Sequence, residues 1–156
     1  MKMITKFALT ALCLSFLVAA QAKKPQTVVP QAAKGFGVTL AIDKMSYSAG
    51  KIPLTLHAVM TLFNNTGTPL VFSERGRSVE WQVLDSHRNV VWDYSIGRSF
   101  PMFIIRRTLT SGKLDYPCDI PLTMQDGTPL PPGNYALKGQ LTGVLCSAEV
   151  GFTVVK

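Results

Sequence analysis

Apolar and polar residues alternate with a period of two over most of the chain, which is the pattern of β-strands that bury one face. The first segments of this kind are 38–42 and 54–62. A hairpin pattern follows at 79–83 and 90–94, separated by a polar turn. Because the apolar residues after position 35 do not recur at the 3.6-residue period of an amphipathic helix, the sequence predicts an all-β fold.

The second half of the chain continues this pattern between turns rich in glycine, proline and serine. Its strand segments are 102–109, 116–120, 135–141 and 150–154. Pro117 and Pro121 predict that 116–120 lies at the edge of a sheet, since proline has no N–H to donate to a neighbouring strand. Many short strands separated by turns favour an antiparallel β-sandwich of about seven to nine strands over a barrel.

Three aromatic residues have expected roles in this sandwich. Trp81 and Trp92 fall on the two strands of the hairpin, where indole rings most often pack in the core. A semi-exposed aromatic patch that binds a sugar or a protein partner is the alternative for this pair. Tyr135 follows a Pro-Pro-Gly turn, which predicts a tyrosine corner in which the phenol donates a hydrogen bond to the backbone just upstream.

The N-terminal residues have the order of a secretory signal peptide. Lys2 and Lys6 precede an uncharged, largely apolar run at 7–20. The run ends in Ala20-Gln21-Ala22, which has the small-x-small order of a cleavage site, and we expect cleavage after Ala22. The run is shorter than the roughly 20 residues that cross a bilayer as a helix, so we expect no stable membrane insertion after cleavage.

The chain is thus expected to consist of a signal peptide at 1–22, a flexible segment at 23–34 and a single domain at 35–156. Export predicts an extracytoplasmic location, in a periplasm or outside the cell. The 16 Lys and Arg less two lysines in the signal peptide leave 14, against 9 Asp and Glu, so the exported protein carries a net charge of about +5. Because these charges are scattered and form no basic run, the sequence argues against a nucleic-acid surface.

Two cysteines, Cys118 and Cys146, remain after the predicted cleavage, and an isolated pair in an oxidising compartment usually forms a disulfide. We therefore predict a bond between them. A metal site is the alternative, with His57 and His87 as further ligands, but these residues lack the short spacings of a zinc site. Cys13 lies inside the apolar run without a small residue before it, so we interpret it as part of the signal peptide rather than as a lipoprotein site.

The sequence contains no motif of a known catalytic or cofactor site. Asp85, Ser86 and His87 supply the three residue types of a nucleophilic triad, but neighbours in a turn point in different directions and cannot converge on one substrate. His57 alternates with apolar neighbours and is expected to face solvent. The sequence therefore predicts a protein without enzymatic activity and without a cofactor.

Five blocks of sequence between residues 52 and 143 carry a family resemblance. They are Leu70–Ser73, Val79–Asp85, Val90–Ser95, Thr108–Gly112 and Gly127–Tyr135. Together they resemble the BsuPI-type intracellular proteinase inhibitor domain, which implies an immunoglobulin-like sandwich and a proteinase as protein partner. The chain departs from the family pattern at Cys118-Asp119, where such domains tend to have a Trp-Asp pair, and at the predicted signal peptide, which contradicts the word intracellular.

Two functions follow from these features. The first is an exported protein-binding domain that inhibits a serine proteinase, with a loop lying along the active-site cleft as an extended strand. The loop 94–102 is the candidate, and Tyr94, Arg98, Phe100 and Met102 are its candidate contact residues. An ordinary crossover loop explains the same segment. The second function is a structural or accessory module of the cell envelope, which binds a partner without inhibiting it.

Overall fold

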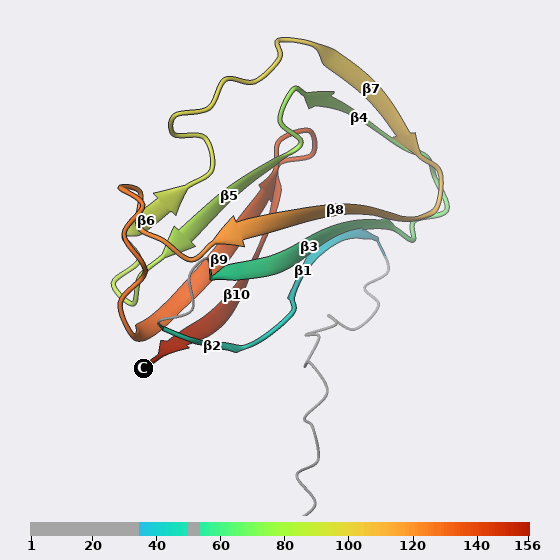
Figure 1. Cartoon of the computed structure of the whole chain (residues 1–156). Helices are drawn as coiled ribbons and strands as arrows, with labels where there is room; N and C mark the ends of the chain where they lie inside the picture. The colour runs from blue at the N-terminus through green and yellow to red at the C-terminus, as the bar shows by residue number, and fades with distance from the viewer. Residues whose placement is uncertain (1–34, 50–53) are drawn as a thin grey trace, which may run out of the picture.

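The computed structural model describes residues 35–49 and 54–156, and the regular elements in these ranges are β-strands (Figure 1). Residues 1–22 and 23–34, for which a signal peptide and a flexible segment are predicted, lie outside the described residues. The described ranges contain ten strands: β1 (Phe36–Ile42), β2 (Ser46–Ser48), β3 (Thr55–Asn64), β4 (Leu70–Arg75), β5 (Val79–Leu84), β6 (Val90–Asp93), β7 (Ile104–Leu109), β8 (Gly112–Pro121), β9 (Gly133–Leu141) and β10 (Cys146–Val155). Within the same ranges, no helix is long and apolar enough to cross a membrane.

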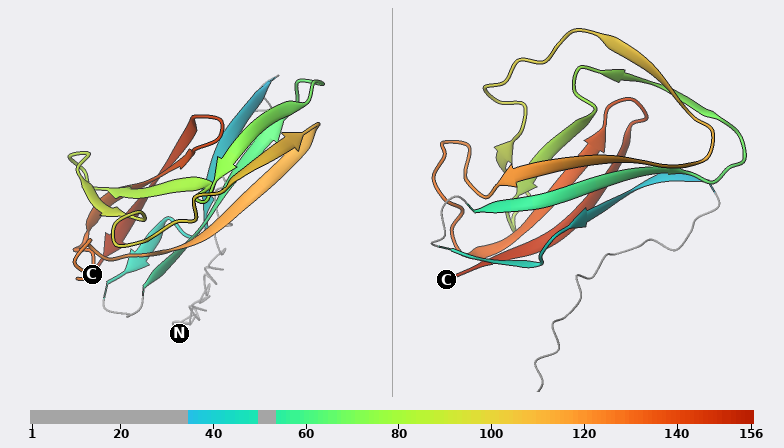
Figure 2. Two further views of the ribbon diagram at one scale, coloured as in Figure 1. Left: turned by 90° about the horizontal axis from the view of Figure 1, so that it is seen from above. Right: turned by 45° about the vertical axis from the view of Figure 1, so that its right-hand side comes forward.

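Two sheets form a sandwich, with their apolar faces packed together (Figure 2). One sheet has the strand order β1-β3-β8 and the other has the order β2-β10-β9-β5-β6. Their strand pairs are antiparallel, except that the short β2 runs parallel to β10. The predicted all-β antiparallel sandwich is confirmed, while its immunoglobulin-like connectivity stays a prediction. The structure has more strands than predicted because β2, with three residues, is too short to show a period-two pattern.

The core lies between the two sheets and follows the alternation predicted from the sequence. On β3, Leu56 and Met60 are fully buried, while His57 on the opposite face is exposed. Trp81 on β5 and Trp92 on β6 are 4% and 6% exposed, so this pair belongs to the core as predicted. Burial of a large apolar side chain contributes about 1.5–3 kcal/mol, so this layer is the main source of the sandwich's stability.

Two further predictions of local structure are confirmed. In the described structure β8 pairs with β3 alone, which agrees with the edge position predicted from Pro117 and Pro121. Tyr135 forms the tyrosine corner, since its Oη donates a 2.8 Å hydrogen bond to the carbonyl oxygen of Pro131. Its ring also stacks on Phe152 of β10, with 5.7 Å between the centroids. The corner therefore fixes the start of β9 against the last strand.

β4 and β7 form a separate two-stranded unit, called the ribbon below, which lies above β8 in the view of Figure 1. One turn joins β3 to β4, and another turn joins β7 to β8; between β4 and β7 the chain passes through β5 and β6 of the sandwich. Asn64 is 1% exposed and joins both turns, because its Nδ2 donates to the carbonyls of Thr68 and Leu109 at 2.8 and 2.7 Å. The strand predicted at 102–109 is shorter in the structure and begins at Ile104.

The predicted disulfide between Cys118 and Cys146 is not formed, and both thiols are free. Cys118 lies on β8 opposite Ala58, whereas Cys146 begins β10 and lies opposite Leu141. Both side chains are half-buried, and their strands belong to different sheets, so neither cysteine is the ladder partner of the other. Burial raises the pKa of the Cys118 thiol and the nearby Asp119 raises it further, which favours the unreactive thiol over the thiolate.

Candidate functional site

The loop between β6 and β7 contains the candidate contact residues, and its first turn is fixed by Asp93. Oδ1 of Asp93 accepts hydrogen bonds from the backbone N and the hydroxyl of Ser95, at 2.7 and 2.6 Å. Oδ2 accepts a hydrogen bond from Nε2 of Gln82, on the neighbouring strand β5, at 2.8 Å. Burial acts to raise the pKa of Asp93, but these hydrogen bonds outweigh it and hold the pKa below its ordinary value. A charged Asp93 therefore anchors the start of the loop.

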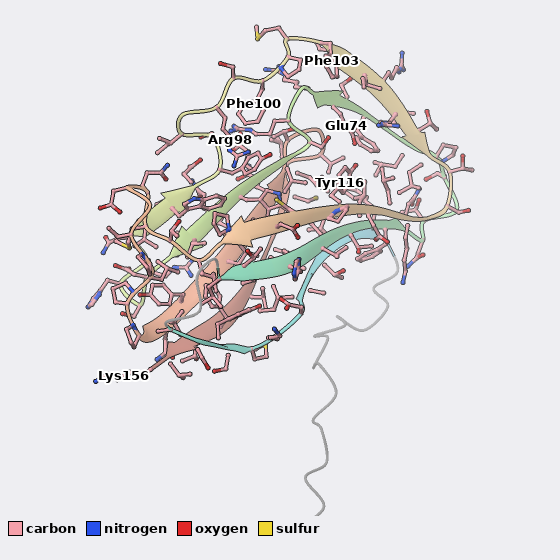
Figure 3. All side chains as sticks on the ribbon, viewed as in Figure 1. Glu74, Arg98, Phe100, Phe103, Tyr116 and Lys156 are labelled. Carbon is pink, nitrogen blue, oxygen red and sulfur yellow. The ribbon has the colours of Figure 1, made fainter. Side chains whose placement is uncertain are left out.

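Three of the four predicted contact residues lie together in one stack. The Arg98 guanidinium lies over the ring of Tyr94, 4.2 Å from its centroid. Tyr94 packs against Phe100 with 5.9 Å between ring centroids, and the guanidinium of Arg77 lies 5.0 Å from the Phe100 centroid. Figure 3 shows Arg98 and Phe100 close together in this loop. Each cation–π contact contributes about 0.5–1 kcal/mol at an exposed site, so the stack stiffens the first half of the loop.

Met102, the fourth predicted residue, lies outside this stack and is fully exposed. Three apolar residues that the sequence reasoning did not select follow it: Phe103, Ile104 and Ile105 are 50%, 67% and 39% exposed. Residues Met102–Ile105 are called the apolar segment below. The signal that could have identified them is the run of four large apolar residues, which breaks the period-two alternation of a half-buried strand.

The start of the apolar segment is held by close packing between two backbones. Gly76, in the connection between β4 and β5, lies against Pro101 of the loop. A Cβ atom at position 76 would lie 1.9 Å from the carbonyl oxygen of Pro101. Only glycine, which has no Cβ, allows the two backbones to approach this closely. The contact fixes the point at which the chain leaves the stack and continues into the apolar segment.

A buried carboxylate connects the ribbon to the sandwich. Glu74 of β4 is 4% exposed, and its oxygens accept hydrogen bonds from Oη of Tyr116 at 2.5 Å and from Nε of Arg107 at 3.0 Å. Tyr116 belongs to β8, so this contact joins the ribbon to the three-stranded sheet (Figure 3). Burial raises the pKa of Tyr116 above its ordinary value, and the hydrogen bond to Glu74 raises it further. The phenol therefore stays protonated and continues to donate.

A pocket of about 540 Å³, called the arginine pocket below, opens beside the apolar segment. Arg75, Arg77 and Arg98 contribute to its lining, together with the carboxylate of Glu80. Arg77 donates a hydrogen bond to Glu80. Met102 also lines the pocket, so the pocket and the apolar segment share a border.

Among the residues considered for metal binding or catalysis, Ser86 Oγ and His87 Nδ1 lie 3.4 Å apart, while His57 and Asp85 have other partners. His57 contacts Asp119 across β3 and β8, with 2.5 Å between Nδ1 and Oδ1, and both side chains are exposed. In the hairpin turn, Asp85 accepts a hydrogen bond from the backbone N of His87, so this carboxylate oxygen is engaged by the backbone rather than by the imidazole. Within residues 35–49 and 54–156, no three His, Cys, Asp or Glu side chains are grouped as a metal ion would require.

Several solved structures resemble the chain at low sequence identity. A β-glucosidase from Erythrobacter marinus is 14% identical, with a TM-score of 0.46, over 78% of this chain and 15% of that protein. The sporulation control protein Spo0M from Bacillus subtilis is 12% identical, with a TM-score of 0.45, over 78% of this chain and 50% of that protein. The β-glucosidase 3B from Thermotoga neapolitana is 12% identical, with a TM-score of 0.41, over 79% of this chain and 16% of that protein. The chain spans half or less of the length of each of these proteins.

Among sequences, no curated protein matches the chain. A family model does match it, over residues 40–145, and this family is described as BsuPI, intracellular proteinase inhibitor. The matched range includes the apolar segment and all four predicted contact residues. The description names an inhibitor rather than an enzyme, which agrees with the prediction of a protein without enzymatic activity.

The family description contradicts the extracytoplasmic location predicted from the sequence. That prediction depended on the order of lysines, apolar residues and small residues within 1–22. The family match lies in residues 40–145, is independent of that order, and is described as intracellular. The location prediction is therefore wrong.

Two observations agree on the family of this protein. The sequence blocks that resemble the BsuPI-type domain fall within residues 52–143. The family model matches residues 40–145, which is more than half of the chain. The protein belongs to the BsuPI family of intracellular proteinase inhibitors.

Proposed function

We propose that the protein inhibits a serine proteinase by placing the apolar segment, Met102–Ile105, in the substrate cleft of the enzyme. The observation that supports this proposal is the exposure of four consecutive large apolar side chains, from 39% for Ile105 to 101% for Met102. Removing apolar surface from water is favourable by about 25 cal/mol for each Å². Burial of the segment against a partner is therefore favourable, and contiguous exposed apolar surface commonly marks a protein contact.

The backbone of the apolar segment suits a cleft that binds an extended chain. Ile104 and Ile105 begin β7, which pairs with β4 and has no other strand neighbour in the described structure. An extended chain can pair with such an edge through main-chain hydrogen bonds, while alternate side chains occupy pockets of the partner. Successive side chains of a strand point to opposite faces, so Ile104 and Ile105 present apolar groups on both sides of the chain.

Contacts before and after the segment favour inhibition over simple cleavage. Pro101 packs on Gly76 just before the segment, and Arg107 binds Glu74 just after it. Holding the chain in one conformation reduces the conformational entropy that binding removes. The same contacts would keep the two ends of a cleaved segment close together, so that product release and turnover become slow.

Titration of the purified full chain against subtilisin-type and chymotrypsin-type proteinases tests this proposal. We expect the wild-type protein to slow peptide hydrolysis with one-to-one stoichiometry. The substitution Ile104→Asp places a charge on the apolar segment and should raise the inhibition constant by at least about tenfold, as loss of a central interface contact does. Val155→Asp is the matched control, because Val155 is a β-branched strand residue that is 40% exposed. Figure 3 shows its neighbour Lys156 far from the loop.

Three results would contradict the proposal in different ways. Absence of inhibition at large molar excess over the whole panel would exclude the inhibitory function. Equal inhibition by the wild-type protein and by Ile104→Asp would exclude the apolar segment as the contact. Rapid cleavage within residues 102–105, detected by mass spectrometry, would identify the segment as a substrate.

A further inference from the structure

The arginine pocket has a surplus of positive charge. Of its three arginines, Arg77 is paired with Glu80. Arg75 and Arg98 have no carboxylate oxygen within 4.0 Å among the residues that the structure describes. The wall of the pocket therefore carries two positive charges that no described carboxylate neutralises at short range.

Two of the three guanidinium groups are positioned by aromatic rings. Arg98 lies over Tyr94 and Arg77 lies over Phe100, at 4.2 and 5.0 Å from the ring centroids. Arg77 already donates to Glu80, whereas Arg98 has no described carboxylate within 4.0 Å, so the planar N–H edge of Arg98 is available to match the two oxygens of a carboxylate. Thr142 Oγ1 also donates a 2.9 Å hydrogen bond to the carbonyl of Arg77, which fixes the backbone of that residue. The donors are thus arranged before any ligand arrives.

The apolar part of the lining indicates which kind of anion the pocket takes. Phe100, Met102 and Leu145 line it beside the arginines, and Met102 and Leu145 are 101% and 81% exposed. A free phosphate ion is hydrated on all sides and gains nothing from apolar walls, whereas an Asp or Glu side chain has an apolar stem behind its carboxylate. We infer that the arginine pocket binds the carboxylate of an acidic side chain on the target proteinase, at the rim of the cleft that receives the apolar segment.

This inference rests on the proposed inhibitory function and adds partner selectivity to it. A proteinase with an acidic residue at the rim of its cleft is attracted at long range and paired at short range, while one with a basic rim is repelled. Attraction between exposed charges is screened over about 10 Å at 0.1 M salt. Inhibition of an acidic-rimmed proteinase should therefore weaken as the salt concentration rises.

The first test compares Arg98→Gln with Lys156→Ala as inhibitors of one proteinase. Arg98→Gln keeps a flat amide beside Tyr94 but removes the charge, and it should raise the inhibition constant by about tenfold at low salt. Lys156→Ala removes one positive charge far from the loop (Figure 3), and it should change the constant by less than about twofold. Circular dichroism verifies that both variants are folded. Equal inhibition constants for the two variants would overturn the inference, because inhibition would then depend only on the net charge of the protein and not on the arginine pocket.

A direct binding measurement separates this inference from the inhibitory function. Tetraglutamate is titrated into the wild-type protein and into Arg98→Gln, and backbone amide and arginine Nε–Hε signals are followed by NMR. Saturable chemical-shift changes at the pocket would support the inference if they are weaker in Arg98→Gln and do not occur with tetralysine. This result does not depend on whether any proteinase of the panel is inhibited. Binding of inorganic phosphate without binding of tetraglutamate would overturn it, and so would binding of neither.

Discussion

An alanine at position 76 would drive the loop away from the connection between β4 and β5. Its Cβ would lie 1.9 Å from the carbonyl oxygen of Pro101, 2.8 Å from its carbonyl carbon and 3.0 Å from its nitrogen. These are backbone atoms, so no side-chain rotation can relieve the clash. Because Cβ atoms essentially never approach other atoms closer than 3.0 Å, the two backbones must separate by at least 1.1 Å, the difference between 3.0 and 1.9 Å.

The energetic effect of this separation follows from the packing around Pro101. Inserting a methyl group into a well-packed site destabilises a protein by about 1–3 kcal/mol. The neighbouring Phe100 would shift as well, which weakens its contact with Arg77. A loss of 1 kcal/mol lowers the Tm of a domain of about 60–250 residues by roughly 2–8 °C, so the expected change is several degrees. Inhibition should weaken by about tenfold, because the apolar segment would no longer be held in place.

Thermal unfolding and proteinase inhibition, measured on the same samples, test this reasoning. Gly151→Ala is the matched control, because a Cβ at this position of β10 has its nearest neighbour at 3.8 Å, an ordinary contact. We expect Gly76→Ala to lose stability and inhibition, and Gly151→Ala to retain both. If Gly76→Ala has the Tm and the inhibition constant of the wild-type protein, the reasoning is refuted. Pro101 would then move without loss of stability, and Gly76 would not position the apolar segment.

Two further predictions concern the polar groups that anchor the loop and the ribbon. The pKa of Asp93 is lower in the folded than in the unfolded protein, so its carboxylate stabilises the fold above about pH 4, and this contribution is lost as the pH falls through the folded pKa. The free energy of unfolding, measured with urea, should therefore fall less on acidification in Asp93→Asn than in the wild-type protein. The difference should be less than about 1 kcal/mol because the carboxylate is partly solvated. Identical pH profiles of the two proteins would contradict this role of Asp93. Asn64→Ala removes the donor to the carbonyls of Thr68 and Leu109 and should lower the same free energy by about 1–3 kcal/mol; an unchanged value would mean that water replaces the amide.

Features encoded within one strand or one turn could be predicted from the sequence. The alternation at 54–62 indicated a strand with one buried face, and the structure has β3 over Thr55–Asn64 with Leu56 and Met60 buried. The tyrosine corner needs only a turn and a phenol within five residues, and its hydrogen bond is present at Tyr135. In both cases the physical cause is local, because pleat geometry and turn chemistry depend on neighbouring residues.

Features that depend on distant contacts could not be predicted in this way. Glu74 and Tyr116 are 42 residues apart, and the sequence does not distinguish Glu74 from a solvated strand residue. Gly76 and Pro101 are likewise brought together only by the path of the loop. The prediction of a disulfide was wrong for the same reason. The prediction rested on the number of cysteines and the expected compartment, and neither carries information on which strand lies opposite Cys118 or Cys146.

An exposed apolar edge strand is normally a risk for self-association, and the charges around the apolar segment reduce that risk. Arg106 follows the segment on β7, and Arg75 lies opposite Ile104 on β4. Pairing the edges of two copies would bring these arginines together, and their repulsion would oppose the apolar attraction. A proteinase with an acidic rim would instead be attracted to the same charges. The arginines that favour the proposed partner therefore also disfavour a second copy of the chain, which allows the segment to remain exposed until the partner binds.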